Sequence, residues 1–238
     1  MSFATKLRHQ LELRQIDVIA ELRQGDSLEH ILNKHLRTIE RLSASEIFTS
    51  VLLLSSDGKH LTHGAAPSLP KSYVEAIDGS AIGPAAGSCG TAAYLGRPVY
   101  VSDIATDPLW ADYYELALSH GLRSCWSTPI RHAGGEVMGT FAIYHQGLGG
   151  PTEDELASID IITDNVAQAL TWARNPDAIM YAFEMLPRLK ALEAITAVIR
   201  QQAESLGPEG NDAIDLILQG TRQLTEIVQR HLPDADGA

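Results

Sequence analysis

The chain has 238 residues, of which 45% are apolar and 20% charged, and 18 Lys and Arg against 30 Asp and Glu give a net charge of −12. This acidic balance argues against broad nucleic-acid binding, which uses a basic face, and against adsorption to an anionic membrane. Two cysteines are too few for a disulfide scaffold. No stretch suits a transmembrane helix or a signal peptide, so we expect a globular cytoplasmic protein.

Residues 2–45 have the periodicity of two helices. The first carries a loose apolar stripe and ends at Gly25. Asp26 or Ser27 caps the second, and Glu29 lies three residues after Asp26, in capping-box position. Apolar residues then repeat every three to four positions as far as Leu42, which is typical of an amphipathic helix.

Residues 46–174 change to strands and short helices. Strands are predicted at 47–54, 59–63, 97–101, 124–130 and 137–144. The Ser55–Gly58 segment suits a hairpin turn, and a second turn is predicted at His132–Gly135. Thr152 should cap a long helix, with Glu155 three residues further on.

Residues 175–238 have the pattern of helices separated by breakers. Pro187 should kink or restart a helix that continues to about Leu206. The Gly207–Gly210 segment is predicted to be a loop, followed by an amphipathic helix from about Ile214. The tail beyond Pro233 is predicted to be disordered.

The order of these elements indicates the α+β class, because antiparallel strands lie between helical segments without regular βαβ alternation. Neither a G-x-G-x-x-G sequence nor a Walker loop is present, which argues against a doubly wound nucleotide-binding fold. The chain also shows no kinase phosphoacceptor box, no GGDEF-type motif and no helix-turn-helix.

Several motifs follow one another through the middle of the chain. They are Gly64–Pro70, Gly87–Ala93, Pro98-Val99 with Asp103-Ile104, Asp107–Trp110, Gly121–Ile130 and Gly139–Tyr144. In this order and with this spacing, roughly residues 15–172 closely resemble a GAF domain, the small-molecule sensory module common in bacterial signalling.

The resemblance implies a six-stranded antiparallel sheet with long helices on one face and a ligand pocket on the other. The chain would then divide into an N-terminal helical extension (1–14), a GAF domain (15–174), a C-terminal helical hairpin (175–232) and a disordered tail (233–238). The hairpin would serve dimerisation or partner docking.

The segment from Gly87 to Thr91 is the clearest candidate for ligand contact. Its glycines flank a predicted helix start, where unpaired N–H groups and partial positive charge suit a small anion. A purely structural role is the alternative, in which Ser88 caps the helix and the glycines permit a tight turn.

Within the family, the pattern resembles free-standing nitrate receptors, which hold a small anion at a helix N-terminus. For Trp110 and Trp126, the alternative to ligand contact is a purely structural role in the apolar core. The resemblance implies a ligand site composed of Ala65, Ser88, Cys89, Gly90, Thr91, Ala92, Arg97, Pro98, Val99, Ile104, Trp110 and Trp126.

A redox enzyme is a competing hypothesis, because free methionine-R-sulfoxide reductases also have GAF folds. Cys89 matches a cysteine of those enzymes, but their catalytic cysteine would fall near Leu118, and Cys125 replaces their substrate-binding carboxylate. Sulfoxide chemistry would then lack its nucleophile. We therefore expect that the chain is not an enzyme, and a redox role of the two cysteines stays open.

Two other ligand classes are associated with the family. Haem could bind through His63, His120 or His145, but no haem-attachment motif is present, and we expect no cofactor. The sequence motif of cyclic-GMP-binding GAF domains is missing. No histidine or cysteine cluster has the spacing of a metal site.

The expected role is that of a sensor that signals through its terminal helices. Residues 175–238 have a net charge of −5, from ten acidic and five basic residues, unlike a basic RNA-binding module. We expect a homodimer and a protein partner, a kinase or a transcription regulator, without direct contact to nucleic acid or membrane. The alternative is a degenerate GAF domain that only scaffolds dimers.

Overall fold

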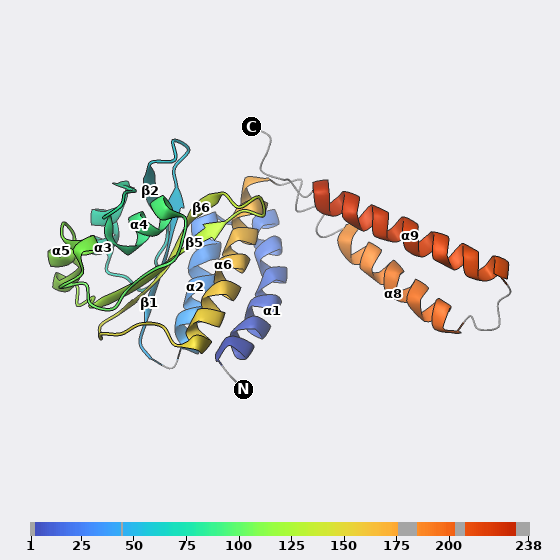
Figure 1. Ribbon diagram of the computed structural model, residues 1–238, viewed down its shortest axis with the longest axis horizontal. Helices are drawn as coiled ribbons and strands as arrows, with labels where there is room; N and C mark the ends of the chain where they lie inside the picture. The colour runs from blue at the N-terminus through green and yellow to red at the C-terminus, as the bar shows by residue number, and fades with distance from the viewer. Residues whose placement is uncertain (1–2, 44, 176–184, 203–207, 232–238) are drawn as a thin grey trace. The chain divides into compact units, whose positions relative to one another are not determined.

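The computed structural model describes residues 3–43, 45–175, 185–202 and 208–231 (Figure 1). It separates into two compact units, Met1–Leu170 and Thr171–Ala238. The predicted tail at 233–238 lies outside the described residues. None of the described helices is long and apolar enough to cross a membrane.

The first unit is built on a six-stranded sheet in which every neighbouring pair is antiparallel. The strand order is β3-β2-β1-β6-β5-β4. The strands are β1 (Phe48–Leu54), β2 (His60–Ala65), β3 (Ser80–Ala81), β4 (Val99–Val101), β5 (Ser124–Arg131) and β6 (Val137–His145). The α+β class and the sheet implied by the resemblance are thus confirmed.

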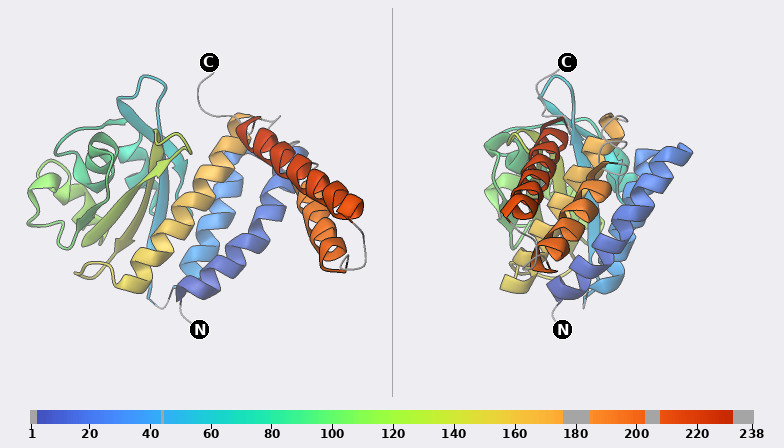
Figure 2. Two further views of the ribbon diagram at one scale, coloured as in Figure 1. Left: turned by 45° about the vertical axis from the view of Figure 1, so that its right-hand side comes forward. Right: turned by 90° about the vertical axis from the view of Figure 1, so that its right-hand side faces the viewer.

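Three long helices, α1 (Phe3–Gln24), α2 (Leu28–Leu42) and α6 (Glu153–Arg174), lie side by side on one face of the sheet (Figures 1 and 2). The stripe of α2 is buried at Ile31, Leu32, Leu36 and Ile39, as its periodicity predicted. The helix α1 runs without a break across residue 14.

Local sequence signals set the starts of two of these helices. Ser27, rather than Asp26, caps α2, and its Oγ accepts a hydrogen bond from the His30 N–H at 3.2 Å. Thr152 and Glu155 form the predicted capping box at the start of α6. The Thr152 N–H donates a hydrogen bond to Glu155 Oε2 at 2.8 Å, and the Glu155 N–H donates one to Thr152 Oγ1 at 3.3 Å.

The opposite face of the sheet carries short elements, and these position the site. They are α3 (Lys71–Ile77), α4 (Gly87–Leu95), the 3-10 helix η1 (Pro108–Trp110) and α5 (Tyr114–Ser119). A buried apolar cluster that includes Leu69, Val101, Ile104 and Leu122 joins these elements to the sheet.

The second unit contains the helices α8 (Leu186–Gln202) and α9 (Pro208–His231), which pack against each other. Pro187 lies in the first turn of α8, where a missing N–H costs no helical hydrogen bond. The predicted loop at 207–210 is wrong over its last three residues, because Pro208 begins α9, a position that suits its fixed φ. The helix predicted before Pro187 lies largely outside the described residues.

Candidate functional site

A cavity of about 40 Å³ lies between the sheet and the short elements on its open face. Strands β1, β2 and β6 form its floor, and α3, α4, η1 and α5 contribute its walls. The lining residues are Leu52, Leu61, Tyr73, Ile77, Ser80, Ala81, Ala86, Gly87, Ser88, Cys89, Gly90, Trp110, Tyr113, Leu116 and Tyr144. None of these side chains carries a permanent charge.

The first turn of α4 forms one wall of the cavity. Ala86 precedes the helix without a side-chain cap, and Gly87 has a φ of +60°, a left-handed conformation that favours glycine. Among the described residues, no acceptor meets the N–H groups of Gly87, Ser88 or Cys89. These donors and the partial positive charge of the helix end therefore lie in the lining of the cavity, without a partner among the described residues.

Ser88 joins three elements around the cavity. Its Oγ accepts a hydrogen bond from Trp110 Nε1 at 3.1 Å and donates one to the Cys125 carbonyl at 3.0 Å. Ser88 is fully buried. The hydroxyl therefore fixes η1 and β5 against the start of α4.

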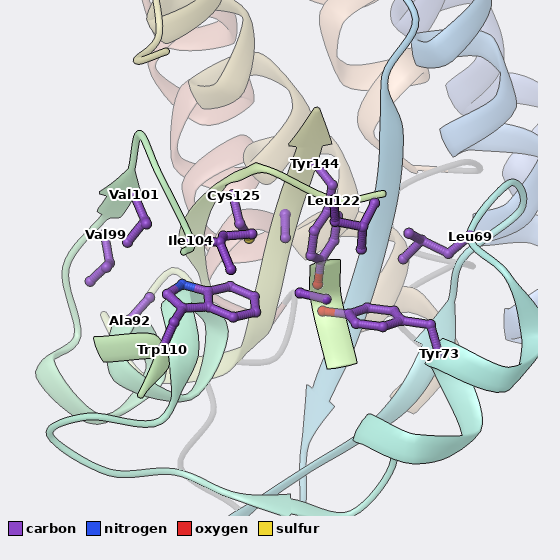
Figure 3. Close-up of a cluster of buried hydrophobic side chains, with 12 residues drawn as sticks. Leu69, Tyr73, Ala92, Val99, Val101, Ile104, Trp110, Leu122, Cys125 and Tyr144 are labelled. Atoms are coloured by element: carbon purple, nitrogen blue, oxygen red, sulfur yellow. The ribbon is translucent and has the colours of Figure 1, made fainter. Parts of the chain in front are cut away.

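Two tyrosines complete the wall opposite Trp110. The rings of Tyr73 and Tyr144 meet edge to face with centroids 5.8 Å apart, and Figure 3 shows their hydroxyl groups close together. Burial raises the pKa of both phenols well above the ordinary value of 10. Both hydroxyls therefore stay protonated and can act as hydrogen-bond donors.

Cys89 and Cys125 are free thiols, and Cys89 packs against the buried cluster that includes Cys125. A hydrogen bond from Cys125 is the largest cause that lowers the pKa of Cys89, to about 7, against the opposing effect of burial. Burial, and then Cys89 itself, raises the pKa of Cys125 well above its ordinary value. Of this pair, Cys89 is the thiol that ionises more readily.

The described residues contain no group of three or more His, Cys, Asp or Glu side chains that could hold a metal ion. The three histidines considered for haem lie apart and outside the cavity lining. His120 contacts Ser72 and the edge of Tyr73. His63 lies near Glu29, and His145 packs against Trp126 with the two rings tilted by 46°.

Comparison with known proteins identifies the family that has this architecture. The sequence model of the GAF domain family matches residues 25–171, well over half of the chain. The chain belongs to the GAF domain family. The short elements and the cavity therefore occupy the open face of a GAF sheet.

A relative of this GAF domain is the methyl sulfide methyltransferase-associated sensor of Methanosarcina acetivorans. The two are 38% identical over 154 residues, which is 65% of this chain and 15% of that protein. The chain thus spans only a small part of the length of this relative.

Solved structures share the fold at low sequence identity. A Burkholderia vietnamiensis protein that is named a GAF sensor superposes with a TM-score of 0.56 at 17% identity, over 72% of this chain and 99% of its own. The free methionine-R-sulfoxide reductase of Neisseria meningitidis, bound to its substrate, gives a TM-score of 0.55 at 17% identity, over 74% and 95%.

The second of these structures corrects one expectation. The sequence analysis excluded an enzyme, and this exclusion was wrong, because an enzyme has the same GAF fold and the fold itself does not rule out catalysis. The fold therefore accommodates catalysis, and Cys89 brings one thiol to the lining of this cavity.

The structure brings only part of the predicted ligand site to the cavity. Ser88, Cys89, Gly90 and Trp110 line it. Thr91 and Ala92 lie deeper in α4, Val99 and Ile104 pack in the apolar cluster, and Arg97 and Pro98 are exposed.

Two predicted residues lie on the opposite face of the sheet. Cys125 pairs with Tyr144, which lines the cavity, so Trp126, the next residue, points to the helix-covered face. There Trp126 Nε1 donates a hydrogen bond to the Gly149 carbonyl at 2.9 Å. Ala65 pairs with Val51, which is also on that face because its neighbour Leu52 lines the cavity.

The sequence analysis missed the tyrosine wall. Tyr73 comes from α3 and Tyr144 from β6, 71 positions apart in the sequence, so no local motif joins them. Alternation along β6 puts Tyr144 on the same face as Thr140 and Ala142, but only the pairing with β5 and β1 shows which face that is.

Proposed function

We propose that residues 25–171 form a sensory domain that binds a small acceptor-rich ligand, nitrate or a similar monoanion, in the cavity beside α4. The observation that carries this proposal is the set of donors at an otherwise uncharged cavity. Three unpaired N–H groups at the start of α4 and the hydroxyls of Tyr73 and Tyr144 supply hydrogen bonds. A single negative charge suits the helix end.

The size of the cavity supports a small ligand. A volume of about 40 Å³ exceeds the roughly 10–15 Å³ that one water requires and is far below the roughly 300–1,000 Å³ of pockets that hold drug-sized ligands. A cyclic nucleotide would require the surrounding loops to open. The ligand would contact Ser88 and Trp110, which are hydrogen-bonded to each other. The Ser88 hydroxyl is also hydrogen-bonded to the Cys125 carbonyl of β5, so a change at the ligand can reach that strand. A signal follows only if the ligand binds one arrangement of these elements better than another.

Thermal unfolding of the full chain tests this proposal. Nitrate, nitrite, iodide, chloride and cyclic nucleotides are compared at constant ionic strength. A ligand at a hundred times its Kd adds about 2.7 kcal/mol to the free energy of unfolding, which raises the Tm by several degrees. A rise with nitrate but not chloride is the expected result.

Matched variants on α5 test the location. Leu116 lines the cavity and Leu118 does not, so Leu116→Phe should remove the ligand-induced rise and Leu118→Phe should keep it. Arg97→Ala should also keep it, because Arg97 is exposed and outside the cavity. No rise with any of these compounds, or equal loss in both α5 variants, would contradict the proposal.

We also propose that the second unit forms a homodimer through α8 and α9. Leu189 and Ile214 are buried, whereas a stripe of apolar residues at helical spacing is at least 43% exposed: Leu192, Ile195, Ile199, Ile217 and Leu224. A two-helix hairpin cannot cover such a stripe, and a second copy would complete a four-helix bundle.

Light scattering after size-exclusion chromatography tests the dimer. Ile217→Glu should give a monomer, because it puts a charge into the apolar stripe. Gln219→Glu adds the same charge on the polar side of α9 and should leave the dimer intact. A wild-type monomer at micromolar concentration would contradict this proposal.

The partner of this sensor is proposed to be a kinase or a transcription regulator in the cytoplasm. The name of the Methanosarcina relative, a sensor, supports a signalling role. Ligand-dependent binding of a purified candidate partner, measured by calorimetry with wild-type and Leu116→Phe protein, would test the link between cavity and partner.

A further inference from the structure

Cys89 and Cys125 occupy one small volume of the core although they belong to different elements. Cys125 of β5 lies directly opposite Tyr144 of β6, and the Tyr144 hydroxyl is 3.7 Å from the Cys89 sulfur. The hydrogen bond of Ser88 to the Cys125 carbonyl holds the residue next to Cys89 against β5. Cys89 also packs against the buried apolar cluster that includes Cys125.

The two thiols differ in their access to solvent. Cys89 lines the cavity and is partly exposed, whereas Cys125 is 0% exposed. A small reagent that enters the cavity therefore meets Cys89 first. Cys125 can react only with a group that Cys89 already carries.

The surroundings of Cys89 stabilise a thiolate. It is the third residue of α4, where the helix end favours negative charge. The buried hydroxyls of Ser127 and Thr140 have no partner at ordinary hydrogen-bond length among the described residues. Both nevertheless lower the pKa of Cys89. Both hydroxyls therefore favour the ionised form of Cys89 over the thiol.

We propose that Cys89 and Cys125 form a redox-active dithiol that a small hydroperoxide converts into a disulfide. The Cys89 thiolate attacks one peroxide oxygen, so that an S–O bond forms, the O–O bond breaks, and the leaving oxygen takes a proton from solvent. The product at Cys89 is a sulfenic acid. The hydroperoxide, reduced by two electrons, leaves as water or an alcohol.

Cys125 completes the reaction. Its sulfur attacks the sulfenic sulfur, an S–S bond forms, and the hydroxide that leaves takes the Cys125 proton and departs as water. A small dithiol such as dithiothreitol restores both thiols by exchange. The reaction needs no other ligand, so this inference is independent of the function proposed for the cavity.

The test uses the reduced full chain and hydrogen peroxide, followed by unfolding, alkylation and peptide mapping. We expect both cysteines to become resistant to alkylation, one peptide pair linked through Cys89 and Cys125, and complete reversal by dithiothreitol. The inference is overturned if both thiols remain alkylatable, or if Cys89 oxidises further without a link to Cys125.

Single-cysteine variants assign the order of the two steps. In Cys125→Ala, Cys89 should stop at the sulfenic acid and be trapped by dimedone. In Cys89→Ala, Cys125 should be recovered as a free thiol after unfolding. Oxidation of Cys125 without Cys89 would overturn the assignment. If the buried Cys125→Ala change prevents folding, the linkage in the wild-type chain decides alone.

Discussion

Ser88 stabilises the cavity wall through a single hydroxyl. Ser88→Ala leaves Trp110 Nε1 and the Cys125 carbonyl without their partner, and a buried unsatisfied group costs about 1–3 kcal/mol. Urea unfolding should show a loss of this size. Ser56→Ala, in an exposed turn, is the control and should change stability by less than about 0.5 kcal/mol. Equal stability of the two variants would show that the Ser88 bonds contribute nothing.

The reactivity of Cys89 should depend on pH in a defined window. Because its pKa is lowered to about 7, the thiolate fraction, and with it the alkylation rate, should rise about fivefold from pH 6 to pH 7 and less than twofold from pH 7 to pH 8. Alkylation rates of the reduced, folded wild-type chain measure this profile, because Cys125, which lowers the pKa of Cys89, is 0% exposed and stays protected. A rate that rises tenfold per pH unit up to pH 8 would indicate an ordinary thiol.

His35 on α2 should make the folded state sensitive to acid. It is 3% exposed, neither ring nitrogen has a partner among the described residues, and burial, followed by the charge of Arg14, lowers its pKa to about 4 from 6.5. Between pH 6.5 and pH 4 the unfolded chain binds a proton there and the folded chain does not. The free energy of unfolding therefore falls as pH falls.

The size of this effect follows from the shift. The difference of about 2.5 units corresponds to about 3 kcal/mol, lost between pH 6.5 and pH 4. Urea unfolding of wild-type and His35→Leu protein at both values measures it, and the variant should lose less stability on acidification. Identical losses would mean that His35 is not the group responsible.

At the scale of elements, the close approach of β1 and β6 depends on one glycine. A β-carbon at Gly139 would lie 2.2 Å from the Leu52 carbonyl oxygen, so the strands would have to separate. Gly139→Ala should cost about 3 kcal/mol or more and remove most folded protein at 37 °C. Gly134→Ala, in the β5–β6 turn, should fold normally, because a β-carbon there would meet only the His132 ring at an ordinary contact distance of 3.8 Å.

The elements that the sequence predicted correctly are those with local causes. The stripe of α2 and the capping box of Thr152 and Glu155 need only neighbours within a few residues. The start of α9 was predicted wrongly because a proline next to glycines suggests a loop. Proline is equally suited to the first position of a helix, and the sequence does not distinguish these roles.

The cavity depends on contacts between distant elements, and its prediction was correspondingly partial. The start of α4 was found because glycines and a small polar residue mark it locally. Trp126 was assigned to the site although it faces the helices, because a one-residue shift in strand register exchanges the two faces. Tyr73 could not be predicted, since only the folded chain brings α3 beside β6.

At the scale of the whole molecule, the first unit should fold alone. Its core is formed by side chains from Leu7 to Leu170, and α6 ends at Arg174. A chain of residues 1–175 should therefore unfold cooperatively with a Tm within a few degrees of that of the same transition in the full chain. A truncated chain without a cooperative transition would show that the second unit supports the first.

Trp110 gives the cavity an optical reporter. Its indole is 4% exposed and forms part of the cavity wall, whereas Trp126 lies across the sheet and Trp172 lies in α6. Indole emission shifts in colour and intensity with the polarity of its surroundings. Occupation of the cavity, or a disulfide beneath α4, should therefore change the fluorescence of Trp110 while the other two tryptophans supply a constant background. A Trp110→Phe variant would identify the part of the fluorescence that comes from Trp110. Ligand binding or disulfide formation could then be followed in real time in unlabelled protein.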